Sequence, residues 1–191
     1  RIPGIKGSAL QFDGKRAHVV VPHDYNIDGL TEFTLSAWVR LDKLPERGNG
    51  RTIICKGPEA PVQHFWWWIG YPPNYRLVLE MGNERHRWGT SFASQPLKWQ
   101  LGRWYHVAVA YKWDGQKARA WFYRDGQLVG QGEKDELLHS GDYDVIIGGY
   151  GSSRGANAPV SRMHMMAGAI DEVRIYRRAL SASEIAKLAN R

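Results

Sequence analysis

An alternation of apolar and polar residues with a period of two runs through most of the chain and limits the folds it can adopt. In the segment 33–41, every second residue is apolar, which places five apolar side chains on one face of a strand and Trp38 on the other. Successive side chains of a strand point to opposite sides of a sheet, so this period is typical of half-buried strands.

Segments of this kind follow one another at close spacing, with turn residues between them. Asp114-Gly115 and Asp125-Gly126 favour tight hairpins, so we expect mostly antiparallel sheets. The expected strands cover residues 17–21, 33–41, 52–55, 64–70, 76–81, 88–92, 104–113, 117–123, 144–148 and 169–177.

One helix is expected, at the C-terminal end of the chain. Ser181 and Glu184 have the spacing of a capping box, and Ile185 and Leu188 then form one apolar face. Many short strands with a single terminal helix predict an all-β fold, an antiparallel two-sheet β-sandwich or jelly roll with a short C-terminal helix.

Composition restricts the class of protein further. The chain has 191 residues, 43% of them hydrophobic and 24% charged, which suits one domain over residues 1–191 with a core of its own. No apolar run approaches the roughly 18 residues of a membrane span. The net charge of +7 favours a polyanionic partner or simply solubility. Cys55 is the only cysteine, so neither an internal disulfide nor a cysteine-based zinc site is expected.

Aromatic residues are the strongest functional signal, with nine Trp and nine Tyr. In the strand 65–69, Trp66 and Trp68 share one face, whereas Phe65, Trp67 and Ile69 share the other. Both sets cannot enter the same core. One set is therefore predicted to lie on an outer or concave sheet surface, and the pattern does not decide which.

Sugar rings stack their C–H faces on aromatic side chains, each contact contributing on the order of 1 kcal/mol, so glycan binding needs several rings together with hydrogen-bonding groups. Arginine can bind a carboxylate or sulfate through two parallel hydrogen bonds. The alternative for residues 84–88 is a solvated edge strand. The predicted ring contacts are Trp67, Tyr71, Trp88 and Trp99, with Arg85, Arg87 and His64 as polar partners.

Four segments together resemble a known family. They are 7–14 (GSALQFDG), 33–39 (FTLSAWV), 104–109 (WYHVAV) and 168–176 (GAIDEVRIY), and in this order they are similar to the signatures of laminin G-like modules of the concanavalin A-like lectin/glucanase superfamily. The resemblance implies a jelly roll of two curved antiparallel sheets. The resemblance defines the function of the chain less well, because this fold carries lectins, adhesion modules and enzymes.

In bacteria, such modules are often attached to carbohydrate-active enzymes and bind glycans. The resemblance therefore implies a location that is extracellular, periplasmic or at the bacterial cell surface. Because the sequence opens at Arg1 without an initiator methionine or a leader, we expect a mature product or a piece of a longer protein, with a covalently linked catalytic domain as one partner.

Some branches of the family hold a structural calcium ion. By resemblance, Asp13 and Asp171 would lie close together, because the first and last strands often pair, and would supply two of its oxygen ligands. The alternative is that Asp13 shapes a turn and Asp171 accepts hydrogen bonds from backbone amides.

Three functions remain open. The first is non-catalytic binding of a polysaccharide, an acidic one being an option, by an aromatic groove. The second is an enzyme, either a polysaccharide lyase acting on a uronic-acid polymer or a glycoside hydrolase, although the Glu-x-Asp-x-Glu strand of superfamily hydrolases is absent. The third is a protein-interaction or adhesion module. No nucleic-acid motif is present, so nucleic acid is not an expected partner.

Overall fold

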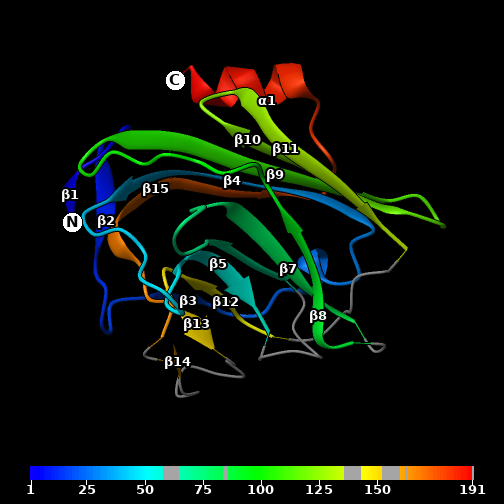
Figure 1. Ribbon diagram of the computed structural model, residues 1–191, viewed down its shortest axis with the longest axis horizontal. Coiled ribbons are helices and arrows are strands. Elements are labelled where there is room, and N and C mark those ends of the chain that lie inside the picture. The colour runs from blue at the N-terminus through cyan, green and yellow to red at the C-terminus, as the bar shows by residue number, and fades with distance from the viewer. Residues whose placement is uncertain (58–64, 84–85, 136–142, 152–159, 162, 191) are drawn as a thin grey trace.

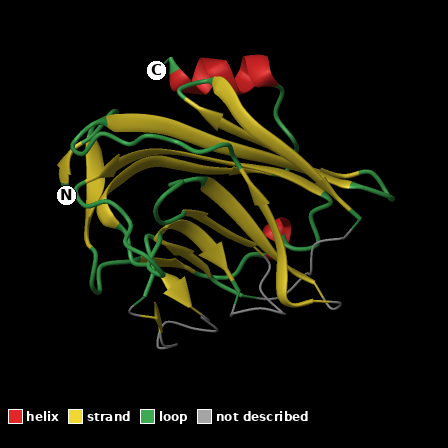
Figure 2. Cartoon of the chain, in the orientation of Figure 1, coloured by secondary structure: helices red, strands yellow, loops and turns green. Residues whose placement is uncertain are grey.

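Two antiparallel sheets stack face to face, and a short helix lies on the outer side of the larger one (Figure 1). The structure, a computed structural model, describes residues 1–57, 65–83, 86–135, 143–151, 160–161 and 163–190. Figure 2 shows that strands account for most of the fold, with loops joining them at both ends of the sandwich. The predicted all-β sandwich with a C-terminal helix is confirmed.

Strand order defines the sheets. In the seven-stranded sheet it is β1 (Ile2–Pro3), β2 (Ser8–Asp13), β15 (Ala167–Tyr176), β4 (Glu32–Leu41), β9 (Trp104–Trp113), β10 (Ala118–Arg124) and β11 (Gln127–Lys134). In the six-stranded sheet it is β3 (Val19–Val21), β12 (Val145–Ile147), β5 (Arg51–Lys56), β6 (Phe65–Ile69), β7 (Leu77–Asn83) and β8 (His86–Ala93).

Three small elements complete the described part of the chain. β13 (Tyr150–Gly151) and β14 (Val160–Ser161) form a two-stranded sheet, which lies on the side of the six-stranded sheet that faces away from the larger sheet (Figure 1). The 3₁₀ helix η1 (Tyr25–Ile27) joins β3 to β4. The helix α1 (Ala182–Ala189) ends the chain and is too short to span a membrane, as are the other helical segments of the described residues.

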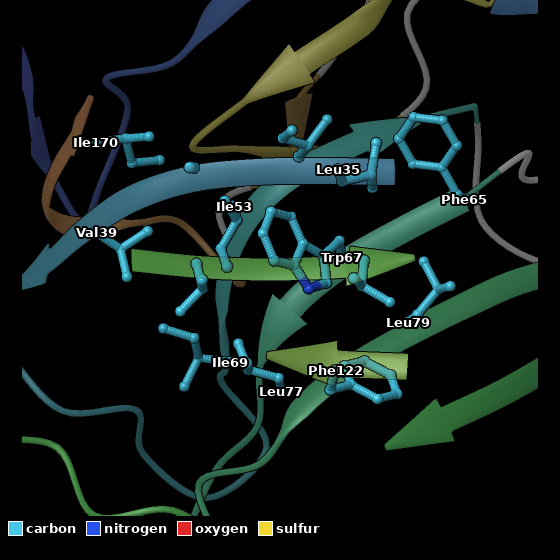
Figure 3. Close-up of a cluster of buried hydrophobic side chains, with 14 of the residues drawn as sticks. Leu35, Val39, Ile53, Phe65, Trp67, Ile69, Leu77, Leu79, Phe122 and Ile170 are labelled. Carbon is cyan, nitrogen blue, oxygen red and sulfur yellow. The ribbon is translucent and has the colours of Figure 1, made fainter. Parts of the chain in front are cut away.

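The core lies between the two sheets and is built from the alternating residues of the facing strands. All five apolar residues predicted to share one face of β4 are buried there. Trp67 lies in the middle of this core with its indole between side chains of both sheets, as Figure 3 shows. The period-two pattern thus identified the inward face of β4 correctly.

The helix α1 starts as its sequence predicts. Ser181 accepts a hydrogen bond from the Glu184 backbone N–H, while the Glu184 carboxylate accepts one from the Ser181 backbone N–H. Ile185 and Leu188 are buried against Ala108 of β9 and neighbouring side chains on the outer face of the seven-stranded sheet. This face of the sheet is therefore covered at one end.

The strand β11 was not predicted, because it carries two glycines and mostly exposed side chains. The structure explains both glycines. A Cβ at Gly130 would lie 2.6 Å from the Ser94 Cα, and one at Gly132 would lie 3.1 Å from the Phe92 ring. The glycines allow this edge strand to approach the end of β8 closely, which joins the two sheets along one side of the sandwich.

Candidate ligand-binding face

The strand β6 sends its tryptophans to opposite sides of the six-stranded sheet. Trp67 points into the core and is 0% exposed. Trp66 and Trp68 point outward into a separate cluster with Cys55 and Tyr150. The sequence left open which set would face outward, and the structure places Trp66 and Trp68 there.

The outward tryptophans form part of a row of four rings, which we call the aromatic column. Trp66 and Trp68 stack with their planes 10° apart and their centroids 4.5 Å apart. Tyr150 lies 4.2 Å from Trp66 on one side, and Tyr71 lies 6.0 Å from Trp68 on the other. The column therefore runs from β13 across β6 to the loop that follows β6.

Access to the aromatic column differs along its length. Trp66 is 6% exposed and Trp68 8%, whereas Tyr71 is 41% exposed. The Trp66 indole N–H donates to the Thr52 hydroxyl at 2.9 Å, which fixes that ring on the sheet. The Tyr71 end is thus the open part of the column, and the tryptophans form a rigid support behind it.

His164 closes the column along its edge. Its ring is edge-on to those of Trp66, Trp68 and Tyr150, with interplanar angles of 69°, 64° and 83° and centroid distances of 4.9, 5.8 and 5.6 Å. The Gly50 backbone N–H donates to its Nδ1 at 2.9 Å. Burial, with a smaller effect of Arg51, lowers the pKa of His164 to about 4, so the ring is neutral at pH 7.

Gly50 is required at this position by packing. A Cβ there would lie 2.3 Å from the Trp68 Cε3 atom, so the loop can lie flat against the indole only as glycine. The Asn49 side chain next to it accepts a hydrogen bond from the His164 backbone N–H at 2.7 Å. The loop before β5 and the segment before β15 are held together over the column in this way.

One carboxyl group lies beside the column. Glu80 of β7 pairs directly with Trp66 of β6, so both side chains project from the same outer face. Burial raises the pKa of the Glu80 carboxyl to about 7. Near neutral pH this group exchanges between a hydrogen-bond donor and an acceptor.

The arrangement can bind a ring that has an apolar face and a polar edge. The aromatic faces can stack on C–H groups of a ligand. The Glu80 carboxyl and the Tyr71 hydroxyl can form hydrogen bonds with its hydroxyl groups. The rings are held by packing on a sheet, so little side-chain freedom would be lost on binding.

Two other predicted ring contacts lie elsewhere. The Trp67 ring belongs to the core, and its Nε1 has no hydrogen-bond partner there. Trp99 is buried beside Tyr105, at a centroid distance of 5.1 Å, and its Nε1 donates to the Tyr75 backbone carbonyl at 2.8 Å. Of the predicted ring contacts whose side chains the structure describes, Tyr71 is the one that it brings to the aromatic column.

The other four predicted residues lie wholly or by their side chains outside the described part of the chain. His64 and Arg85 lie outside the described residues. Arg87 and Trp88 belong to β8, the edge strand of the six-stranded sheet, but their side chains are outside the description.

The two aspartates expected to hold calcium do not lie together. Asp13 pairs with Ala167, whereas Asp171 lies four residues further along β15, about 13 Å at 3.3 Å per residue. One oxygen of Asp13 accepts hydrogen bonds from the backbone N–H groups of residues 15, 16 and 17. These hydrogen bonds lower the pKa of the Asp13 carboxyl to about 2.

Asp171 accepts from the backbone N–H groups of Ile5, Lys6 and Glu172. Both carboxylates therefore serve backbone amides, and they do not fit a shared calcium ion, which needs six to eight oxygens around it. The described residues also contain no group of three or more His, Cys, Asp or Glu side chains placed to hold a metal.

Sequence reasoning missed several members of the site. The alternation in β6 pointed to Trp66 and Trp68 as one possible outer pair. Glu80 could have been found as the single charged residue in the apolar run of β7. Tyr150 and His164 gave no local signal, because they reach Trp66 from more than eighty positions along the chain.

The fold and this aromatic outer face define a lectin-like β-sandwich. The model of the family described as the concanavalin A-like lectin/glucanases superfamily, Laminin_G_3, matches residues 13–186, and the chain belongs to this family. By sequence, no curated protein matches the chain.

Solved structures share the fold. A heptameric SAP-like pentraxin from Limulus polyphemus is 18% identical, with 95% of this chain and 81% of that chain covered and a TM-score of 0.67. Domain 4 of AbnA, an extracellular GH43 arabinanase from Geobacillus stearothermophilus solved with arabinotriose, is 20% identical, with 98% and 79% covered and a TM-score of 0.65.

A sialidase module gives a third comparison. The CBM40 of the Ruminococcus gnavus IT-sialidase, solved with α2,3 sialyllactose, is 12% identical, with 92% of this chain and 97% of that chain covered and a TM-score of 0.62. These similarities support a carbohydrate-binding, lectin-like fold.

Proposed function

We propose that this domain binds a polysaccharide without catalysis, through the open end of the aromatic column. The observation that carries the proposal is the parallel Trp66–Trp68 stack on the outer face of the six-stranded sheet, outside the core, ending at the exposed Tyr71. The stack itself is buried and holds its rings in place, so the exposed Tyr71 ring at its end is the surface that a ligand would meet.

The chemistry of the column fits a sugar ring. The Tyr71 ring would stack on a C–H face of one sugar unit, and Trp68 behind it holds the tyrosine in place. The Glu80 carboxyl would bond a hydroxyl group of the ligand, as acceptor when ionised and as donor when protonated.

The net charge of +7 supports an acidic polysaccharide as the preferred ligand. Two of the similar structures, from an extracellular arabinanase and from a sialidase, are modules of carbohydrate-active enzymes solved with sugars. By this analogy, we place the domain outside the cell and attached to a catalytic domain that acts on the same glycan.

Affinity gel electrophoresis tests the proposal. The domain is run through gels that contain one polysaccharide each, either neutral (arabinan, xylan, galactan) or acidic (alginate, ulvan, glucuronan). We expect retardation by at least one gel, with retention by acidic polymers falling as salt is added. Unchanged mobility in all of them would overturn the proposal.

The same polymers test the enzymatic alternative. Incubation with the domain is followed by ultraviolet absorbance, which rises when a lyase creates unsaturated ends, and by reducing-end release, which reports hydrolysis. We expect no change in either readout. Product formation would replace the binding function with a catalytic one.

A further inference from the structure

A cavity of about 330 Å³ opens on the opposite side of the molecule from the aromatic column. Its floor is the outer face of the seven-stranded sheet, made by Ser36 and Trp38 of β4 and His106 of β9. Leu188 of α1 lines one part, and Ile5 and Lys6, in the segment between β1 and β2, line another. Its size suits a small ligand, at the lower end of the range for ligand pockets.

The floor contains a buried polar atom without a protein partner. His106 is 1% exposed, and its Nε2 lies 2.9 Å from the Ser36 hydroxyl. The other ring nitrogen, Nδ1, is buried and has no hydrogen-bond partner. Because this nitrogen has almost no accessible surface, a ligand in the cavity would not reach it, and the polar contacts must come from the side chains at the rim.

Trp38 provides an aromatic surface next to this nitrogen. Its ring lies 5.4 Å from the His106 ring, at an angle of 66°, and both residues line the cavity. Trp38 is only half-buried, since no strand of the other sheet covers this face. An indole face in a cavity that also holds charged side chains is suited to a ring with one apolar face and polar edges.

A charged pair stands at the side of the cavity. Glu172 and Arg174 form an ion pair, and their side chains are 25% and 28% exposed, so each can still reach a ligand. The two side chains present carboxylate acceptors and guanidinium donors next to each other. Such a planar pair can bond two neighbouring hydroxyl groups of one ring.

The backbone is strained where this pair is attached. Glu172 has a φ of +49°, in the left-handed region that favours glycine, and β15 is irregular between Asp171 and Arg174. The Asp171 carboxylate accepts hydrogen bonds from the backbone N–H groups of Glu172, Ile5 and Lys6. It therefore ties the irregular part of β15 to the segment between β1 and β2, which also lines the cavity. Backbone strain of this kind gathers at functional sites, so it supports a role for the cavity.

We propose that this cavity binds one neutral monosaccharide unit, stacked on Trp38 and bonded by Glu172 and Arg174. The side chains that line the cavity bear positive charge on Lys6 and Arg174 and negative charge on Glu172, and the Asp171 carboxylate stands beside them, so the charges balance. A balanced set of donors and acceptors favours hydroxyl groups over an ionic ligand.

This site shares no residue with the aromatic column, so it does not depend on the function proposed there. With both sites occupied, the domain would hold two sugar chains on opposite faces of the sandwich. A polymer with both kinds of ligand would then be bound with higher avidity than either site gives alone.

The test is a ¹H–¹⁵N correlation NMR titration of the intact domain with glucose, galactose, mannose, arabinose and N-acetylglucosamine. The Trp38 indole N–H signal is assigned with the Trp38→Phe variant. We expect a saturable shift of this signal and of the amides of residues 106 and 174 with at least one sugar, with a Kd on the order of 1 mM for a ligand of this size. The absence of any such shift up to about 100 mM sugar would overturn the proposal.

Variants separate binding from folding. Arg174→Gln should weaken binding about tenfold or more, whereas Arg119→Gln, an arginine of the same sheet that is also paired with carboxylates, should leave it unchanged. Glu172→Gly relieves the left-handed strain, so it should fold at least as stably as the wild type in urea and still lose binding. Full binding by Glu172→Gly would contradict the proposal.

The Tyr71→Ala variant distinguishes this site from the aromatic column. It should leave the monosaccharide shifts intact, whatever it does to polysaccharide binding. Loss of the shifts in Tyr71→Ala would show that the sugar binds at the column and would overturn the second site.

Discussion

Replacing Glu80 with Gln should change how the stability of the domain depends on pH. The carboxyl of Glu80 lies beside the aromatic column, where burial raises its pKa from 4.5 to about 7. A glutamic acid with a raised pKa binds its proton more tightly in the folded state than in the unfolded chain. Its contribution to stability is complete below pH 4.5 and is lost as the pH rises to about 7.

The size of this effect follows from the two pKa values. The interval from 4.5 to about 7 corresponds to about 3 kcal/mol of unfolding free energy, of which about 2.5 kcal/mol falls between pH 5 and pH 8. Gln resembles the protonated glutamic acid in shape and carries no charge. Relative to the wild type, Glu80→Gln should therefore gain about 2.5 kcal/mol between these two pH values.

Two histidines require that the variant be compared with the wild type at each pH. Burial lowers the pKa of His106 and of His164 from 6.5 to about 4. Their contribution is complete above pH 6.5 and is lost as the pH falls toward 4, which is opposite in sign to that of Glu80. The wild-type profile alone would mix these effects, but the difference between variant and wild type isolates Glu80.

The assay is urea unfolding followed by tryptophan fluorescence at about pH 5, 6, 7 and 8. Glu133→Gln, at an exposed glutamate of β11, is the matched control. Its free energy of unfolding should depend on pH in the same way as that of the wild type. Parallel pH profiles for Glu80→Gln and the wild type would refute the reasoning, since they would mean that the Glu80 carboxyl is solvated.

Three further predictions concern the core, the thiol and the helix. Trp67→Ala should lose about 3–5 kcal/mol of stability in urea unfolding, because it empties the centre of the sandwich. Cys55 should react with an aromatic disulfide reagent only after unfolding, since burial raises the pKa of its thiol to about 12; rapid reaction in the native state would contradict this. Ser181→Ala should cost about 1 kcal/mol by removing the cap of α1, measured by thermal unfolding.

The architecture could be predicted because it depends on local periodicity. In β4 the alternation alone identified the buried face, since any sheet with one buried side must turn its apolar residues inward. The capping box of α1 is likewise complete within four residues. The strand β11 could not be predicted in this way, because its glycines are explained only by contacts with Ser94 and Phe92 in another part of the chain.

The candidate site could be predicted only in part, because it depends on how strands pair. The alternation in β6 separates Trp67 from Trp66 and Trp68, but both faces are equally aromatic. The register with β7 and a bulge opposite β5 decide which face turns inward, and neither is a local property of the sequence. The aspartates Asp13 and Asp171 show the same limit, since their strands pair as expected but the register keeps them four residues apart.

The most direct test of glycan binding at the aromatic column is calorimetric titration with the polysaccharide that retards the domain most, comparing Tyr71→Ala with Tyr25→Ala. Tyr25 is 83% exposed on η1, away from the column, and controls for the loss of an exposed tyrosine. Tyr71→Ala should raise the Kd about fivefold, corresponding to about 1 kcal/mol for one stacking contact, while Tyr25→Ala should bind like the wild type. Equal affinity of all three proteins would contradict the account.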